Sequence, residues 1–174
     1  MSKTLVILAH PNLKESIGNK IISNLVALEG NVEVRHLDQL YPDFKIDIEA
    51  EQNALINADV IVFQYPLFWY SVPAILKEWI DQVFQYGFAF GTGSQLNDKK
   101  IIVSFTMGSP KKDYPNETID KILFPFQGLA GYCNMNYAGE VVSNNINNYA
   151  PGAGEKAAKI AEEHAERLIE LINQ

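Results

Sequence analysis

The stretch that decides the fold is Val60–Phe84, which reads VIVFQYPLFWYSVPAILKEWIDQVF. It opens with Val60–Phe63, an apolar run rich in β-branched residues of the kind found in a buried parallel strand. A loop at Gln64–Val72 follows, and Pro73 stands where the first turn of a helix is expected. In open α/β sheets, ligands bind beyond the carboxyl ends of the strands, where such loops lie. The stretch therefore predicts a strand, a candidate ligand-binding loop and a helix in succession.

The loop contains four large aromatic side chains: Tyr65, Phe68, Trp69 and Tyr70. Rings gathered beside one strand end suit a flat, π-rich ligand. Aromatic side chains are also common core residues, so the alternative interpretation is that these rings pack in the core. The loop by itself leaves both interpretations open.

Similar patterns recur along the rest of the chain. Apolar runs predict four further strands, at Thr4–Ala9, Val32–Leu37, Ile101–Phe105 and Met135–Val142. Helices are predicted between and after them, from an N-cap at Ser16 to Gly30, over Ala50–Ala58, after Pro73, over Thr118–Leu129 and over Glu155–Asn173. Pro125 is expected to kink or interrupt its helix, and Ala150–Gly154 is expected to be a linker.

This alternation of strands and helices predicts a parallel sheet with helices on both faces. The predicted fold class is α/β, a flavodoxin-like three-layer sandwich whose five-stranded parallel sheet has the order 2-1-3-4-5. A single domain over residues 1–174 is expected. The polar or aromatic loops after strands one, three and four then share one edge of the sheet. That convergence favours the ligand-site interpretation of the aromatic loop.

Composition limits the function classes. The 174 residues are 47% hydrophobic and carry a net charge of −7, which is typical of a soluble protein and argues against a nucleic-acid partner. The single Cys133 excludes an internal disulfide and a multi-cysteine metal site, and no metal is predicted. Cys133 is expected to be a buried small hydrophobe, with a reactive thiol as the alternative. No apolar run approaches the ~18 residues of a membrane span, and no secretory leader is recognised, so a cytoplasmic location is expected.

The loop after the first strand, His10–Asn19, reads HPNLKESIGN. It contains neither the glycine fingerprint of dinucleotide folds nor a Walker A sequence. The helix that follows offers free N–H groups and a positive dipole end, Ser16 and Asn19 add side-chain donors, and His10 stands at the strand end. These features predict a seat for a phosphate. An ordinary capped helix with Gly18 as packing relief is the alternative.

Two motifs carry a resemblance to a known family. The pattern AHPxxxxSxxN after the first strand, with FQYPLFWYSVPAILKxW after the third, resembles the NAD(P)H:quinone oxidoreductases of the flavodoxin-like superfamily. Leu40–Asp47 and Tyr86–Gly91 resemble a small bacterial branch that includes quinone reductases, general stress proteins and flavin-bearing ancillary subunits of glutathione-gated potassium efflux systems. The resemblance runs from Thr4 to about Tyr137.

The resemblance implies a set of cofactor-binding residues. In the family the first loop holds the flavin phosphate, which implies His10, Ser16, Ile17, Gly18 and Asn19. The isoalloxazine rests against the loop after strand three, which implies Pro66, Leu67, Phe68, Trp69 and Tyr70. The loop after strand four holds the pyrimidine end, which implies Thr106, Met107, Gly108 and Ser109.

Some positions depart from the family pattern or carry an implied catalytic role. The usual T-T-G-G reads Thr106-Met107-Gly108-Ser109 here, so the approach of this backbone to the flavin is expected to differ in detail. Tyr114 matches the tyrosine that the family uses near flavin N1 and O2, and it is implied to stabilise the reduced flavin as a hydrogen-bond donor. A ring without function in its loop is the alternative. Asp120 stands where some larger relatives have a histidine.

The function implied by the resemblance is a flavin-dependent NAD(P)H:quinone oxidoreductase. FMN is the favoured cofactor, with FAD as the alternative, and NADH or NADPH is the co-substrate. NAD(P)H would pass a hydride to flavin N5 and leave, and a quinone would then accept the hydride in the same slot, a ping-pong mechanism. Trp69 and Tyr114 are implied to be catalytic, Trp69 as a wall of that slot. Phe88 and Phe90 resemble residues that the family donates across a dimer interface, so a homodimer is expected.

Other functions stay open on the sequence. One is a flavin-bearing ancillary regulatory subunit of a glutathione-gated potassium efflux system. Another is an electron carrier of the flavodoxin type, which is disfavoured because the first loop lacks the short Thr/Ser-Gly-Thr phosphate loop of such carriers. Azo- and nitroreductase activity are compatible with the same chemistry. NADH and NADPH stay equally open, since no basic cluster marks a seat for the additional phosphate.

Overall fold

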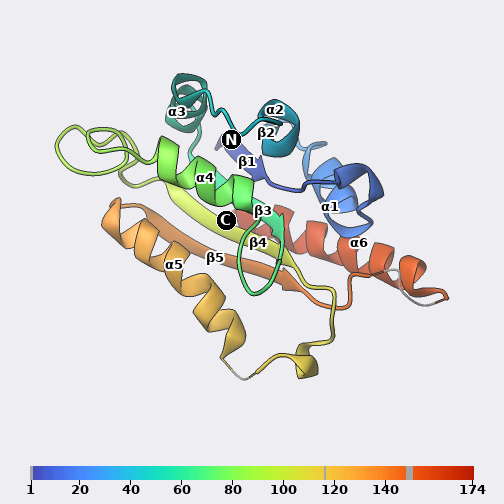
Figure 1. Ribbon diagram of the computed structural model, residues 1–174. Coiled ribbons are helices and arrows are strands. Elements are labelled where there is room, and N and C mark those ends of the chain that lie inside the picture. The colour runs from blue at the N-terminus through green and yellow to red at the C-terminus, as the bar shows by residue number, and fades with distance from the viewer. Residues whose placement is uncertain (1, 116, 148–150) are drawn as a thin grey trace.

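Five parallel strands form one sheet in the order β2-β1-β3-β4-β5, as predicted (Figure 1). The strands are β1 (Thr4–Leu8), β2 (Val32–His36), β3 (Val60–Pro66), β4 (Lys100–Thr106) and β5 (Asn136–Ser143). The structure, a computed structural model, describes residues 2–115, 117–147 and 151–174. β1 and β3 are buried along their whole length because they lie at the centre of the sheet and are covered on both faces.

Helices cover both faces of the sheet, and more of them lie on one face than on the other (Figure 1). The helices are α1 (Gly18–Val26), α2 (Leu37–Leu40), α3 (Ile48–Ile56), α4 (Ala74–Val83), α5 (Thr118–Tyr132) and α6 (Ala153–Ile172), with short 3-10 turns η1 (Leu13–Glu15) and η2 (Lys111–Asp113). Residues of α1 and α6 pack with one face of the sheet, and residues of α3, α4 and α5 pack with the other. This arrangement is the predicted three-layer sandwich.

The two cores differ in the size of their side chains. Between the sheet and α4 and α5 lie large aromatic residues, including Phe63, Trp79 and Phe126. The core under α1 and α6 is built from aliphatic and small residues such as Val62 and Ala161. Small residues on α6, such as Ala161 and Ala165, let this helix pack closely against the sheet.

β3 is longer than predicted, and this corrects the interpretation of Tyr65. The strand continues to Pro66, because its pairing with β4 extends to the Pro66–Thr106 pair. Tyr65 is therefore a core residue with no exposed surface, and its ring stacks on Phe105 and Phe126 at centroid distances of 5.6 and 5.9 Å. Only the last three rings of the predicted aromatic loop reach solvent.

α5 also departs from the predicted course. The helix passes through Pro125 and ends at Tyr132 rather than at Leu129. Pro125 is exposed, whereas Ile122 and Phe126 on either side of it are buried against the sheet. Their burial offsets the one backbone hydrogen bond that a proline removes.

The remaining boundaries differ by a few residues. α3 begins two residues earlier than predicted because the Asp47 side chain accepts a hydrogen bond from the Ala50 N–H and so caps the helix. In the predicted linker Ala150–Gly154, Ala150 lies outside the described residues, and Gly152, with φ of 74°, precedes the first residue of α6. Within the described residues, every helix is too short or too polar to span a lipid bilayer.

Candidate functional site

The carboxyl ends of β1, β3 and β4 meet at one edge of the sheet, and their loops enclose a cavity of about 410 Å³. We call it the first-loop cavity. Its lining residues are His10, Asn12, Glu15, Ser16, Ile17, Gly18, Asn19, Pro66, Leu67, Phe68, Thr106, Gly108, Ile146 and Asn147. Its volume lies within the usual range of small-molecule sites.

The floor of this cavity is the amino end of α1. The Ser16 hydroxyl accepts a hydrogen bond of 3.2 Å from the Asn19 N–H, so Ser16 caps the first turn as predicted. The N–H groups of Ile17 and Gly18 find no acceptor among the described residues. Both N–H groups belong to residues that line the cavity, so they are available to an anion there.

His10 adds a neutral donor. Its Nδ1 accepts a hydrogen bond of 3.1 Å from the Asn12 N–H, and its own backbone N–H donates to Asp38 over 2.7 Å. Burial lowers the pKa of His10 below its ordinary value, although the nearby Asp38 carboxylate opposes that change. The neutral ring therefore carries its proton on Nε2.

The charge of the cavity wall is unusual for an anion seat. Among the described residues, no lysine or arginine lines the cavity, and Glu15 is the one charged residue in its lining. Attraction for an anion must therefore come from oriented neutral donors and from the dipole of α1. Such donors select groups with several acceptor oxygens, as a phosphate has.

Gly18 allows the chain to close over this seat. A Cβ at this position would lie 2.4 Å from Cγ2 of Ile146, which forms the opposite wall. The Ile146 N–H donates to the carbonyl of Met107 over 3.1 Å, so the segment after β5 is fixed to the segment after β4. A side chain at position 18 would force Ile146 to shift, so Gly18 relieves packing at this close approach.

A smaller hollow of about 200 Å³ adjoins the first-loop cavity at Leu67, which lines both. We call it the ring groove. Its lining residues are Leu67, Trp69, Tyr70, Ser109, Asp113 and Tyr114. The rings of Tyr70 and Tyr114 meet edge to face at a centroid distance of 6.0 Å. The polar cavity and the aromatic groove therefore share Leu67 as a wall.

Trp69 and Tyr70 form the tip of a tight hairpin. Phe68 and Ser71 exchange two backbone hydrogen bonds of 3.0 Å each, and the two residues between them have φ of 48° and 64°. Two consecutive positive φ values define a type I′ turn, which usually contains asparagine and glycine. Trp69 is 94% exposed and Tyr70 is 53% exposed. Packing of these rings against the core therefore does little to offset the backbone strain.

Every residue predicted to bind the cofactor lines the first-loop cavity or the ring groove, except Met107. The Met107 side chain is buried, and its N–H donates to Ser143 over 2.8 Å. That N–H is thus engaged within the sheet. The two residues predicted to be catalytic, Trp69 and Tyr114, both line the ring groove.

Sequence reasoning missed the contribution of the fourth loop. Ile146 and Asn147 follow β5 and line the first-loop cavity. The parallel topology itself is a signal for them, because the carboxyl end of β5 lies at the same edge as the other three strand ends. Among the described residues, no group of three or more His, Cys, Asp or Glu side chains is arranged to hold a metal ion.

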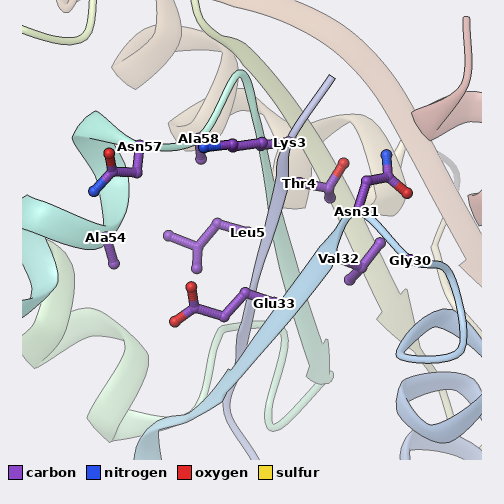
Figure 2. Close-up of a pocket in the computed structure, with 10 residues that line it drawn as sticks. All are labelled: Lys3, Thr4, Leu5, Gly30, Asn31, Val32, Glu33, Ala54, Asn57 and Ala58. Atoms are coloured by element: carbon purple, nitrogen blue, oxygen red, sulfur yellow. The ribbon is translucent and has the colours of Figure 1, made fainter. Parts of the chain in front are cut away.

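A further hollow of about 350 Å³ lies at the opposite, amino edge of the sheet (Figure 2). In Figure 2, Leu5 and Glu33 project into the same space, whereas Thr4 projects to the other side of β1. Glu33 pairs with Arg35 over 3.2 Å. None of the predicted site residues lines this hollow, and it lacks the aromatic slot of the carboxyl edge.

Comparison with known proteins identifies the family of the chain. The family model described as flavodoxin-like fold matches residues 2–171. An uncharacterized NAD(P)H oxidoreductase of Bacillus subtilis, YrkL, is 42% identical over 141 residues, which is 78% of this chain and 81% of that protein. The chain belongs to the flavodoxin-like NAD(P)H:quinone oxidoreductase family.

Solved structures of similar proteins extend this comparison. The general stress protein 14 of Treponema denticola, in complex with FMN, is 32% identical, with a TM-score of 0.87 over 97% of this chain and 99% of that one. An NADPH-quinone reductase of P. pentosaceus is 25% identical, with a TM-score of 0.80 over 95% of this chain and 96% of that one. The family fold is therefore present over nearly the whole chain.

Proposed function

We propose that this chain is an FMN-dependent NAD(P)H oxidoreductase whose acceptor is a quinone. The observation that carries the proposal is the junction of two unlike cavities at Leu67. One is walled by neutral donors at a helix terminus and the other by aromatic rings, and FMN has both a phosphate and a flat ring system. Similarity to an FMN complex and to a quinone reductase supports this choice.

The residues present fit FMN. The N–H groups of Ile17 and Gly18, with the side chains of Ser16 and Asn19, would hold the phosphate. The hairpin tip and Tyr114 would stand beside the isoalloxazine. When bound, FMN would supply the hydride acceptor and donor, chemistry that the protein side chains lack.

Each wall of the ring groove has a role in this proposal. Trp69 and Tyr70 would present flat faces to a nicotinamide and then to a quinone, so that the two substrates use one slot in turn. The Tyr114 hydroxyl would donate a hydrogen bond toward negative charge that builds up on the pyrimidine end. This sequential use of one slot is the physical basis of a ping-pong mechanism.

The phosphate seat is tested by the double variant Ser16→Ala, Asn19→Ala. We expect it to bind FMN about 10 to 100 times more weakly than the parent, because one or two hydrogen bonds to a charged group are lost. Fluorescence titration of FMN measures the change. Asn24→Ala is the matched control, since Asn24 lies on the same helix but is exposed and lines neither cavity. A double variant that retains the affinity of the parent would show that the phosphate does not sit at α1.

We also propose that two copies of the chain associate through the face formed by α4 and α5. A hollow of about 510 Å³ opens there, and its lining includes Phe84, Phe90 and Tyr132. Tyr132 is 71% exposed, whereas Phe88 is nearly buried in its own chain and does not line this hollow. Light scattering should give twice the 19.5 kDa mass of one chain, and Tyr132→Glu should shift the protein toward monomer. A parent that is monomeric at micromolar concentration would refute this association.

A further inference from the structure

A row of buried polar side chains crosses the sheet beneath α1 and α6, near the carboxyl edge. Each member is exposed by less than 5%: Asn19, Gln64, Ser104, Thr106, Ser143 and His164. They come from two helices and three strands, and they are joined to one another by hydrogen bonds. An apolar row would fill the same space, so a fully bonded polar row requires an explanation.

The far half of the row lies on α6 and β5. Arg167 donates to the Ser143 hydroxyl oxygen over 2.7 Å. Each ring nitrogen of His164 forms a hydrogen bond with a different serine. Nδ1 lies 2.9 Å from the Ser143 hydroxyl, and Nε2 lies 2.7 Å from the Ser104 hydroxyl. His164 thus bridges β5 and β4.

The near half of the row leads to the first-loop cavity. The Ser104 hydroxyl donates to Oε1 of Gln64, and Nε2 of Gln64 donates to Oδ1 of Asn19 over 2.7 Å. Nδ2 of Asn19 in turn donates to the Thr106 hydroxyl oxygen over 2.9 Å. Asn19 and Thr106 both line the first-loop cavity, so the row ends at the proposed phosphate seat.

The donors and acceptors of the row fix its direction at His164. Burial, aided by Arg167, lowers the pKa of His164 to about 3, so the ring is neutral and carries one proton. The proton of Ser104 is already used toward Gln64, so Nε2 of His164 must be the donor to Ser104. Nδ1 then accepts the proton of Ser143, whose oxygen in turn accepts from Arg167. Every bond therefore points from Arg167 toward the cavity.

The direction of these hydrogen bonds determines whether Thr106 offers a donor or an acceptor to the first-loop cavity. The Thr106 oxygen accepts from Asn19, and no acceptor for the Thr106 proton appears among the described residues. The proton is therefore available to an occupant of the cavity. With the opposite direction, Thr106 would donate to Asn19 and turn lone pairs toward the cavity, where they would repel an anion.

We propose that His164 is a positioning residue for the cofactor phosphate. It keeps the buried row oriented so that Thr106 and Asn19 meet the phosphate as donors, although His164 lies on α6 and does not line the cavity. This inference rests on the proposed FMN site. It assigns to α6, the C-terminal helix, a role in the selection of a phosphorylated flavin over an unphosphorylated one.

The test compares FMN with riboflavin, which has the same ring system and no phosphate. Dissociation constants of both are measured by fluorescence quenching for the parent, His164→Leu, Ser104→Ala and His164→Gln. We expect the Leu and Ala variants to lose about tenfold in FMN affinity while riboflavin affinity changes less than about twofold. His164→Gln retains one donor and one acceptor, so it should restore most of the preference for FMN.

Controls separate orientation from packing. Leu168→Val alters an equally buried residue one turn later on α6 and should leave the ratio of the two affinities unchanged. If circular dichroism shows that His164→Leu does not fold, the FMN-to-riboflavin ratio of Ser104→Ala decides the test, because this variant removes only one hydroxyl. Nitrogen-15 NMR of the parent should show the His164 proton on Nε2.

The outcomes are distinct. A parent that prefers FMN, with variants that keep the same FMN-to-riboflavin ratio, overturns the role of His164 and leaves the proposed function intact. A His164 proton on Nδ1 overturns it as well. A parent that binds neither flavin refutes the proposed function, and this inference falls with it.

Discussion

At the scale of single residues, the most unusual feature is the composition of the hairpin tip. Trp69 and Tyr70 occupy left-handed backbone conformations, each of which costs a non-glycine residue about 1–2 kcal/mol. Neither ring is buried enough to offset that cost. Strain that the fold does not need is expected where a side chain serves a ligand, and the hairpin stands beside the ring groove.

The strain can be measured with the variant Trp69→Asn, Tyr70→Gly, whose residues suit a type I′ turn. We expect its free energy of unfolding in urea to rise by about 1–3 kcal/mol, while its affinity for FMN and its rate of reduction by NADPH fall. Phe44→Asn is the matched control, because Phe44 also has a positive φ, of 61°, and lines neither cavity. It should gain stability without a change in flavin binding. Absence of stabilisation in the double variant would mean that the aromatic tip is not strained.

At the scale of elements, a buried carboxylate joins β2, α3 and α4 on the face opposite the polar row. Glu51 of α3 has no exposed surface, yet Arg35 donates to both of its oxygens, Trp79 Nε1 donates over 2.9 Å, and the Tyr41 hydroxyl also donates to it. Burial and the neighbouring carboxylate raise the pKa of Tyr41 to about 12, so it remains a donor. The cluster holds α4, which follows the aromatic hairpin, at a fixed position on the sheet.

Glu51→Gln should therefore destabilise the fold. We expect a loss of about 2–4 kcal/mol in the free energy of unfolding, because the partly buried Arg35 loses its principal ion pair. Glu49→Gln, an exposed change on the same helix, should alter stability by less than about 0.5 kcal/mol. Equal effects of the two changes in urea denaturation would contradict this account of the cluster.

Some features of the strands and helices could be predicted from the sequence, and others could not. Apolar runs located all five strands, and their alternation with helices predicted a parallel sheet, for which five strands suit the flavodoxin-like order. The end of β3 was misjudged because Tyr65 looks like a loop residue until its pairing with Phe105 is known. The polar row was invisible for a similar reason. Gln64, Ser104 and His164 are ordinary residues in the sequence, and only the packing of α6 brings them together.

At the scale of the whole molecule, the parallel topology explains why one edge carries the site. All five strands point the same way, so their loops gather at the carboxyl edge, and both cavities open there. The chain has a net charge of −7, and the described residues provide no cationic side chain to the phosphate seat. Affinity for FMN in this account therefore depends on oriented neutral donors, which the buried row of α6 helps to keep in place.

The anaerobic visible spectrum of the FMN-loaded protein shows whether the chain is a flavin-dependent reductase. We expect a bound oxidised flavin whose absorption bleaches within seconds of adding NADPH or NADH and returns when a benzoquinone is added without oxygen. A bound flavin that stays oxidised with both nucleotides would contradict a reductase and favour a regulatory subunit or an electron carrier. A protein that binds no FMN would contradict the whole account.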